Sequence, residues 1–120
     1  MNDNHEPYPT MRELRAKIRK FDVTPVPGSF GLDVGDDGIW TTLIDRRCCG
    51  LGIALLGRPT THNIIVEEAE LDCADLWGED WTMGYIEGFD GLNMDFWATP
   101  EWRHGYRLGK RHALALIKPA

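Results

Sequence analysis

An eight-residue pattern, Trp-x-x-Gly-Tyr-x-x-Gly, occurs twice in the last third of this 120-residue chain, over residues 81–88 and 102–109. At 3.6 residues per turn, the four recurring positions fall on one face of an α-helix. Each copy therefore predicts a helix whose face is built from glycines and aromatic residues: Trp81, Gly84, Tyr85 and Gly88 in the first, and Trp102, Gly105, Tyr106 and Gly109 in the second.

The glycines indicate close packing between backbones. Glycine costs about 1 kcal/mol relative to alanine inside a helix, so four glycines at matched spacing need a structural reason. Two Gly-x-x-x-Gly faces approach closely because no side chain separates them. Thr99 and Pro100 suit a helix start, and Gly88 and Gly91 suit a helix end. We therefore predict an antiparallel αα-hairpin over residues 79–117, in which the eight repeated residues are structural.

Hydrophobic spacing predicts three more helices ahead of the repeat. A capping box at residues 10–13 opens an amphipathic helix that runs to about Phe21 and has a basic outer surface. A second helix, over residues 48–56, is apolar on every side and should be buried. A third, over residues 66–77, directs Asp72 and other acids towards water.

β-Structure should be minor. Residues 39–44 are rich in β-branched and aromatic side chains and predict a short strand, and residues 29–34 predict an extended piece. Residues 64–66 fit either a strand or the start of the following helix. Residues 1–9 contain two prolines and predict a flexible tail. The sequence thus predicts one mainly α domain over residues 10–120, with about five helices and minor β-structure.

Charge is segregated along the chain, whose net charge is −6. Residues 1–20 carry a net charge of +2, residues 21–101 carry −13, and residues 102–120 carry +5. The cations of the last helix fall opposite its glycine face. They fit either of two roles, which are contact with a protein or nucleic-acid partner and packing on the chain's own acidic middle.

The linker between the two copies is apolar from Leu92 to Ala98. It either folds back over the two helices or forms a docking patch. Together with the cations of the last helix, it supplies the residues that we predict to bind a partner: Arg103, Arg107, Lys110, Arg111, Phe96 and Trp97. Pairing of the glycine faces between two chains, which would give a homodimer, stays open.

The sequence gives little support for a metal site, a catalytic site, a membrane span or a disulfide framework. The three cysteines and four histidines show no zinc-binding spacing, so we expect no metal, no cofactor and no catalytic residue. No run of eighteen apolar residues predicts a membrane span, and the acidic N-terminus is unlike a secretory signal. Adjacent Cys48 and Cys49 make a poor disulfide framework, which favours the reducing cytoplasm.

One short motif predicts an enzyme instead. Arg47-x-x-Gly50-x-Gly52 opens the apolar helix after an extended segment. It resembles the acyl-CoA-binding loop of the GNAT acetyltransferases. The resemblance implies backbone N–H groups that hold the pyrophosphate of acetyl-CoA at a helix N-terminus.

The repeat itself resembles another family. Gly84-Tyr85-x-x-Gly88, a linker and then Trp102-x-x-Gly105-Tyr106-x-x-Gly109 resemble the helical hairpin of the ribosome modulation factor family, over residues 79–117. That family has tryptophan where this chain has Tyr106, and it is basic where this chain is acidic. The resemblance implies a hairpin fold and association with the ribosome.

From these features we predict a small, non-enzymatic interaction or regulatory protein of the cytoplasm. It is of the kind that phages and mobile elements encode, and it docks on the ribosome or on a larger nucleic-acid-handling machine. Either the basic last helix or the acidic middle makes the contact, the latter by competing for a nucleic-acid-binding site. The alternative is the GNAT-like acetyltransferase.

Overall fold

The computed structural model describes residues 6–42, 45–60, 69–94 and 98–117, which fold into five helices and two pairs of short strands. The predicted mainly α fold with minor β-structure is confirmed. The helices are α1 (Met11–Phe21), α2 (Gly50–Leu55), α3 (Ala69–Trp77), α4 (Glu79–Phe89) and α5 (Pro100–Leu116). No helix within these ranges has both the length and the apolar composition that a bilayer crossing needs.

α4 and α5 pack backbone against backbone. A Cβ atom placed on Gly84 would lie 2.0 Å from the carbonyl oxygen of Trp102. One placed on Gly105 would lie 2.1 Å from the carbonyl oxygen of Trp81. One turn further along, the same relation holds for a second set of residues: Gly88 with Tyr106 and Gly109 with Tyr85. No side chain larger than hydrogen fits at these four positions while the helices keep their separation.

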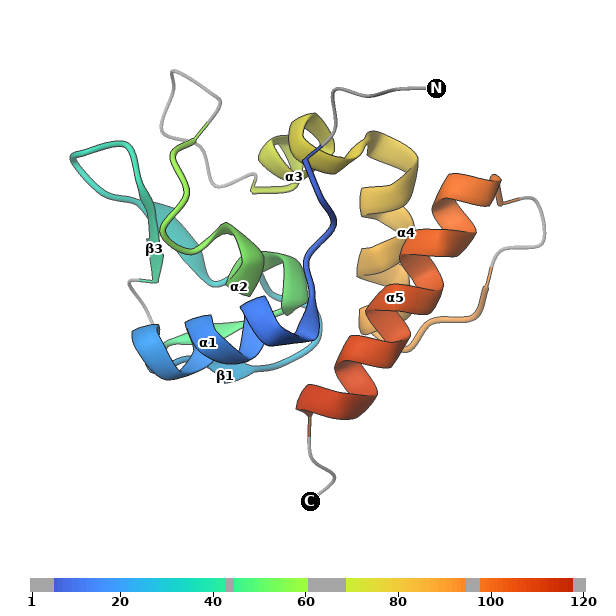
Figure 1. Ribbon diagram of the computed structural model, residues 1–120, viewed down its shortest axis with the longest axis horizontal. Helices are drawn as coiled ribbons and strands as arrows, with labels where there is room; N and C mark the ends of the chain where they lie inside the picture. The colour runs from blue at the N-terminus through green and yellow to red at the C-terminus, as the bar shows by residue number, and fades with distance from the viewer. Residues whose placement is uncertain (1–5, 43–44, 61–68, 95–97, 118–120) are drawn as a thin grey trace.

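The two helices are parallel, so the predicted antiparallel direction is wrong. Gly84 meets Trp102 and Gly88 meets Tyr106, so contacts advance in the same direction along both helices (Figure 1). The physical reason lies in the ten residues between Phe89 and Pro100. An eleven-residue helix is about 16 Å long, and ten extended residues span about 33 Å. The linker can therefore return to the level at which α4 began.

Hydrogen bonds and a glycine turn define the ends of α4 and α5. The Thr99 hydroxyl caps α5 by accepting a hydrogen bond from Trp102 N at 3.2 Å, and it donates one to Asp80 at 3.0 Å. Asp80 lies in the first turn of α4, so the two helices start side by side. At the end of α4, Gly91 adopts a φ of 80°, a conformation that favours glycine.

α2 is buried at the centre of the molecule, between α1, α3 and α4 (Figure 1). A Cβ atom on Gly50 would meet the Tyr85 hydroxyl and one on Gly52 would meet the Phe30 carbonyl, at 2.2 and 2.5 Å. Leu14 of α1 is fully buried beside it. The predicted amphipathic helix and the predicted buried helix are both confirmed.

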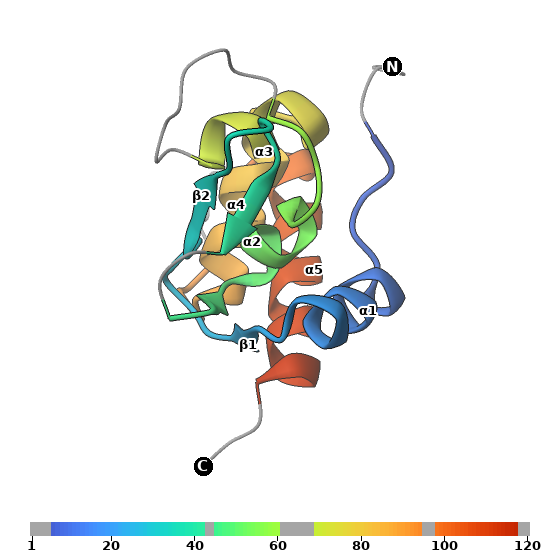
Figure 2. The same cartoon turned by 90° about the vertical axis from the view of Figure 1, so that its left-hand side faces the viewer.

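The strands form two small ladders (Figure 2). β2 (Leu32–Val34) pairs antiparallel with β3 (Trp40–Thr42), which confirms a strand within residues 39–44 and an extended piece within residues 29–34. Residues 43–44 and 64–66 lie outside the described part. The second ladder was not predicted, because strands of two residues leave no alternating pattern. It is parallel and joins β1 (Thr24–Pro25) to β4 (Arg47–Cys48).

Asp72 corrects the prediction for α3. The helical spacing directed this residue towards water, but its side chain is buried, with 1% of its surface exposed. The indole N–H of Trp40, on β3, donates a hydrogen bond to its carboxylate. The polar side chain is therefore satisfied by a residue that is distant in the sequence.

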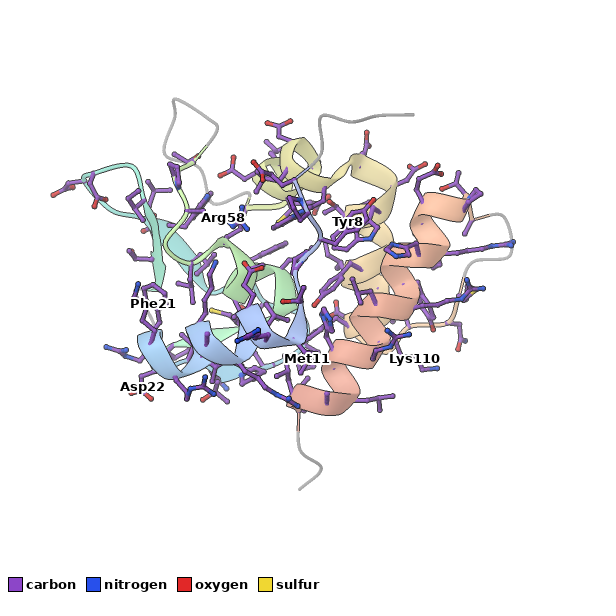
Figure 3. All side chains as sticks on the ribbon, in the orientation of Figure 1. Tyr8, Met11, Phe21, Asp22, Arg58 and Lys110 are labelled. Atoms are coloured by element: carbon purple, nitrogen blue, oxygen red, sulfur yellow. The ribbon has the colours of Figure 1, made fainter. Side chains whose placement is uncertain are left out.

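Residues 6–9 pack against the helices, although the sequence predicted a flexible tail over residues 1–9. Trp77 Nε1 donates a hydrogen bond to the Pro7 carbonyl at 3.0 Å. The Tyr8 ring stacks on Trp81 with 4.5 Å between centroids, and Figure 3 shows it directed towards α4 and α5. Residues 1–5 of the predicted tail lie outside the described part.

The glycine contacts make a prediction about stability. Gly84→Ala and Gly105→Ala should each lower the free energy of unfolding by about 3 kcal/mol, because the added methyl group meets a backbone carbonyl that cannot move alone. In an uncrowded helix the same change would stabilise by about 1 kcal/mol. Urea denaturation measures the difference. Gly35→Ala is the control: its Cβ would lie 3.1 Å from the Asp37 side chain and 3.6 Å from the Ile39 carbonyl oxygen, and its effect should stay below about 1 kcal/mol.

Candidate functional site

The outer face of α5 carries the predicted cations. Because Gly105 and Gly109 face α4, the residues half a turn away face solvent. The side chains on that outer face are exposed: Arg103, Arg107, Lys110 and Arg111. Ion pairs among the described residues join Glu13 to Lys17, Glu13 to Arg58, and Asp45 to Arg47. Arg107, Lys110 and Arg111 thus form no ion pair with the described part of the acidic middle.

An open groove of about 580 Å³ runs along the second half of α5. Three of the four cations line it, and the other lining residues are mostly apolar: Met94, Tyr106, Leu114 and Ala115. Met94 and Leu114 are 41% and 76% exposed, which is high for large apolar side chains. The groove thus combines an apolar floor with a positively charged rim.

The wall opposite α5 is held in place by hydrogen bonding. The Tyr106 hydroxyl donates to the Leu92 carbonyl at 2.5 Å, which fixes the linker beside α5. The Tyr106 ring stacks on Trp102 at 5.1 Å, and Trp102 Nε1 donates to Glu87 on α4 at 3.0 Å. This chain of contacts connects the groove to the paired helices. These contacts place Leu92, two residues before Met94, beside α5.

The structure brings together only part of the predicted binding set. Phe96 and Trp97 lie outside the described residues. Leu114 and Ala115 were not predicted, whereas Met94 belongs to the apolar linker that the sequence offered as a docking patch. Leu114 could have been found from the sequence, because it follows Lys110 by four residues and Arg107 by seven, and so shares their helical face.

The Gly50 region has the geometry of packing. All residues of α2 are buried, and Gly50 faces the Tyr85 hydroxyl and the Phe89 ring. Cys49 N, just before the helix, donates to the Ser29 carbonyl at 2.6 Å. The glycines of Arg47-x-x-Gly50-x-Gly52 thus serve contacts inside the molecule.

The cysteines are free and buried. Burial raises the pKa of Cys48 to about 12 and that of Cys49 to about 11, which disfavours the thiolate. Burial also raises the pKa of Cys73 well above its usual value. Among the described residues, no group of His, Cys, Asp and Glu is arranged to hold a metal ion.

A buried polar pair lies between α4 and α5. The Tyr85 hydroxyl and His112 Nδ1 are 2.6 Å apart and share a hydrogen bond. His112 is 1% exposed. Burial lowers the His112 pKa to about 4, with a smaller contribution from the neighbouring Arg111, and burial raises the pKa of Tyr85 well above its usual value. Both groups are therefore neutral near pH 7.

Comparisons with known proteins give no relative. No protein-family model matches the chain, and neither the curated proteins nor the solved structures contain a significant match. The resemblances to the ribosome modulation factor family and to the GNAT acetyltransferases therefore stay proposals.

The lowered pKa of His112 predicts that the stability of the folded chain depends on pH. Its pKa is about 4 in the folded chain and about 6.5 when unfolded, so the unfolded chain binds the extra proton between these values. Stability should fall by about 3 kcal/mol as the pH drops from 6.5 to 4. Urea denaturation across this range measures it. His112→Gln should remove most of the slope, whereas His104→Gln, at an exposed position, should retain it. An unchanged slope in His112→Gln would contradict the assignment.

Proposed function

We propose that this chain is a non-enzymatic interaction protein that docks on an acidic surface of a larger protein through the outer face of α5. One observation carries the proposal. Arg107, Lys110 and Arg111 are exposed, form no ion pair within the described residues, and surround an apolar groove. Arginine and methionine are enriched in protein interfaces, and Met94 lies in the same groove.

The charge distribution supports a protein partner of opposite sign. Cations at an interface raise the association rate with an acidic surface and disfavour basic partners. Exposed acids occur on α3, at the start of α4 and in the first turn of α5: Glu70, Asp75, Glu79, Asp80 and Glu101. A partner with an acidic surface is thus attracted to α5 and repelled by α3, which orients it.

The cellular setting is part of the same proposal. Cys48, Cys49 and Cys73 are free thiols, which persist in a reducing compartment. We therefore assign the protein to the cytoplasm. A regulatory role suits a small docking protein, because occupying a surface on a larger machine is enough to alter access to it.

Nucleic acid is the second candidate partner. Arg103, Arg107 and Lys110 follow one another at intervals of about one helical turn, a spacing that suits contact with successive phosphates. The resemblance of residues 79–117 to the ribosome modulation factor family favours ribosomal RNA as the form of this partner. Binding through phosphates would weaken steeply with added salt.

Charge reversal on α5 tests the proposed docking. The paired change Arg107→Glu and Lys110→Glu should weaken binding of the partner by about tenfold or more, because attraction becomes repulsion. The measurement is crosslinking and affinity capture from cells that produce the protein, with captured molecules identified by mass spectrometry. RNA in the captured material is sequenced in parallel.

The matched control carries the same charge change on another helix. Arg19→Glu with Lys20→Glu alters two exposed cations at the end of α1, which lies across the molecule from Lys110 (Figure 3). It should retain the captured protein. Equal loss in both variants would show a general charge effect and contradict docking through α5. Capture of ribosomal RNA alone would favour the second candidate.

A further inference from the structure

The groove on α5 exposes apolar surface at the centre of the cationic face. Leu114 is 76% exposed and Met94 is 41% exposed, and both line the groove. Burial of an exposed leucine side chain is favourable, so Leu114 and Met94 would strengthen contact with apolar groups of a partner. A surface that bound its partner by charge attraction alone would not need exposed apolar side chains. The partner must therefore offer apolar groups as well as acids.

The shape of the groove restricts the kinds of molecule that fit it. It is open to solvent along α5, whereas sites for small molecules enclose most of the ligand surface. An open apolar groove along a helix suits the apolar face of another helix, whose anchors recur at i, i+3, i+4 and i+7. The volume of about 580 Å³ leaves room for a few large side chains.

The aromatic content of the groove argues against single-stranded nucleic acid as its occupant. Bases bind to such surfaces by stacking on exposed aromatic rings. Among the described lining residues, Tyr106 is the aromatic one, and it is 7% exposed, with its ring stacked on Trp102. Met94, Leu114 and Ala115 offer aliphatic surface instead, which suits leucine-like anchors.

We infer that the groove binds the apolar face of an acidic amphipathic helix in a partner protein, with large aliphatic side chains over Met94 and Leu114 and carboxylates against Arg107, Lys110 and Arg111. The inference rests on the proposed docking through α5 and states what that surface recognises. The Tyr106 hydroxyl donates a hydrogen bond to the Leu92 carbonyl and so holds the linker beside α5. Recognition thus requires two features at once, apolar anchors and flanking acids.

Synthetic peptides separate the two requirements. The first probe is a helical peptide with leucines at i, i+3, i+4 and i+7 and glutamates on its other faces. In the second, glutamines replace the leucines, and in the third, lysines replace the glutamates. Fluorescence anisotropy with the full chain should give binding of the first peptide about tenfold tighter than of the second. The lysine peptide should not bind measurably.

Two matched leucine variants locate the binding. Leu114→Gln changes an exposed residue of the groove, and Leu71→Gln changes an exposed residue of α3, 42% exposed, without a change of charge in either case. Both should fold as the wild type does. Leu114→Gln should weaken the first peptide by about tenfold, and Leu71→Gln should leave it within about twofold.

Each of the other possible results of these experiments would contradict a specific part of the inference. Equal, salt-sensitive binding of the leucine and glutamine peptides would refute the apolar anchor while docking through α5 stands. Binding of neither acidic peptide would refute both. Competition by a single-stranded RNA oligonucleotide that depends on Leu114 would assign the groove to nucleic acid. Self-association in sedimentation velocity that both leucine variants abolish would make a second copy the occupant, with its acidic α3 in the groove.

Discussion

The backbone contact between α4 and α5 determines most of what this molecule presents to solvent. Gly84 and Gly105 bring each helix against a carbonyl of the other, and only glycine permits that separation. Because this contact fixes the rotation of α5 about its axis, it also fixes which residues face outward. The cations and Leu114 are exposed as a geometric consequence, since they lie half a turn from Gly105 and Gly109.

The repeated octets meet each other in a nearly symmetric way. The first glycine of each copy faces the tryptophan of the other, and the second glycine of each faces the tyrosine of the other. Such reciprocal contact is the intramolecular form of the interface in a symmetric dimer. The glycine faces are therefore already occupied within one chain. A homodimer through these faces would require α5 to leave α4, so any self-association of the intact fold must use another surface.

The sequence predicted the individual helices better than it predicted how they pack and in which direction they run. The cap at Thr99 and the periodicity of residues 11–21 are local signals, and the helices that they predicted are present. Helix direction is absent from such signals, because glycine spacing is the same in parallel and antiparallel pairs. Asp72 was misassigned because its partner, Trp40, is distant in the chain. For the site, charge spacing predicted the exposed cations, while the groove depends on the path of the linker, which the sequence did not reveal.

Charge segregation makes the proposed docking on an acidic partner compatible with the net negative charge of the chain. At physiological salt, charges separated by more than about 8 Å are largely screened, so a short segment on α5 responds to Arg107, Lys110 and Arg111 more than to the net charge of −6. A long nucleic acid extends beyond α5 and approaches the acids of α3 and α4. Under the proposed docking, the same surface would therefore favour a short anionic segment over a long one. A compact acidic helix with apolar anchors would contact both the cations and the apolar side chains of the groove, whereas an extended polyanion would contact the cations alone.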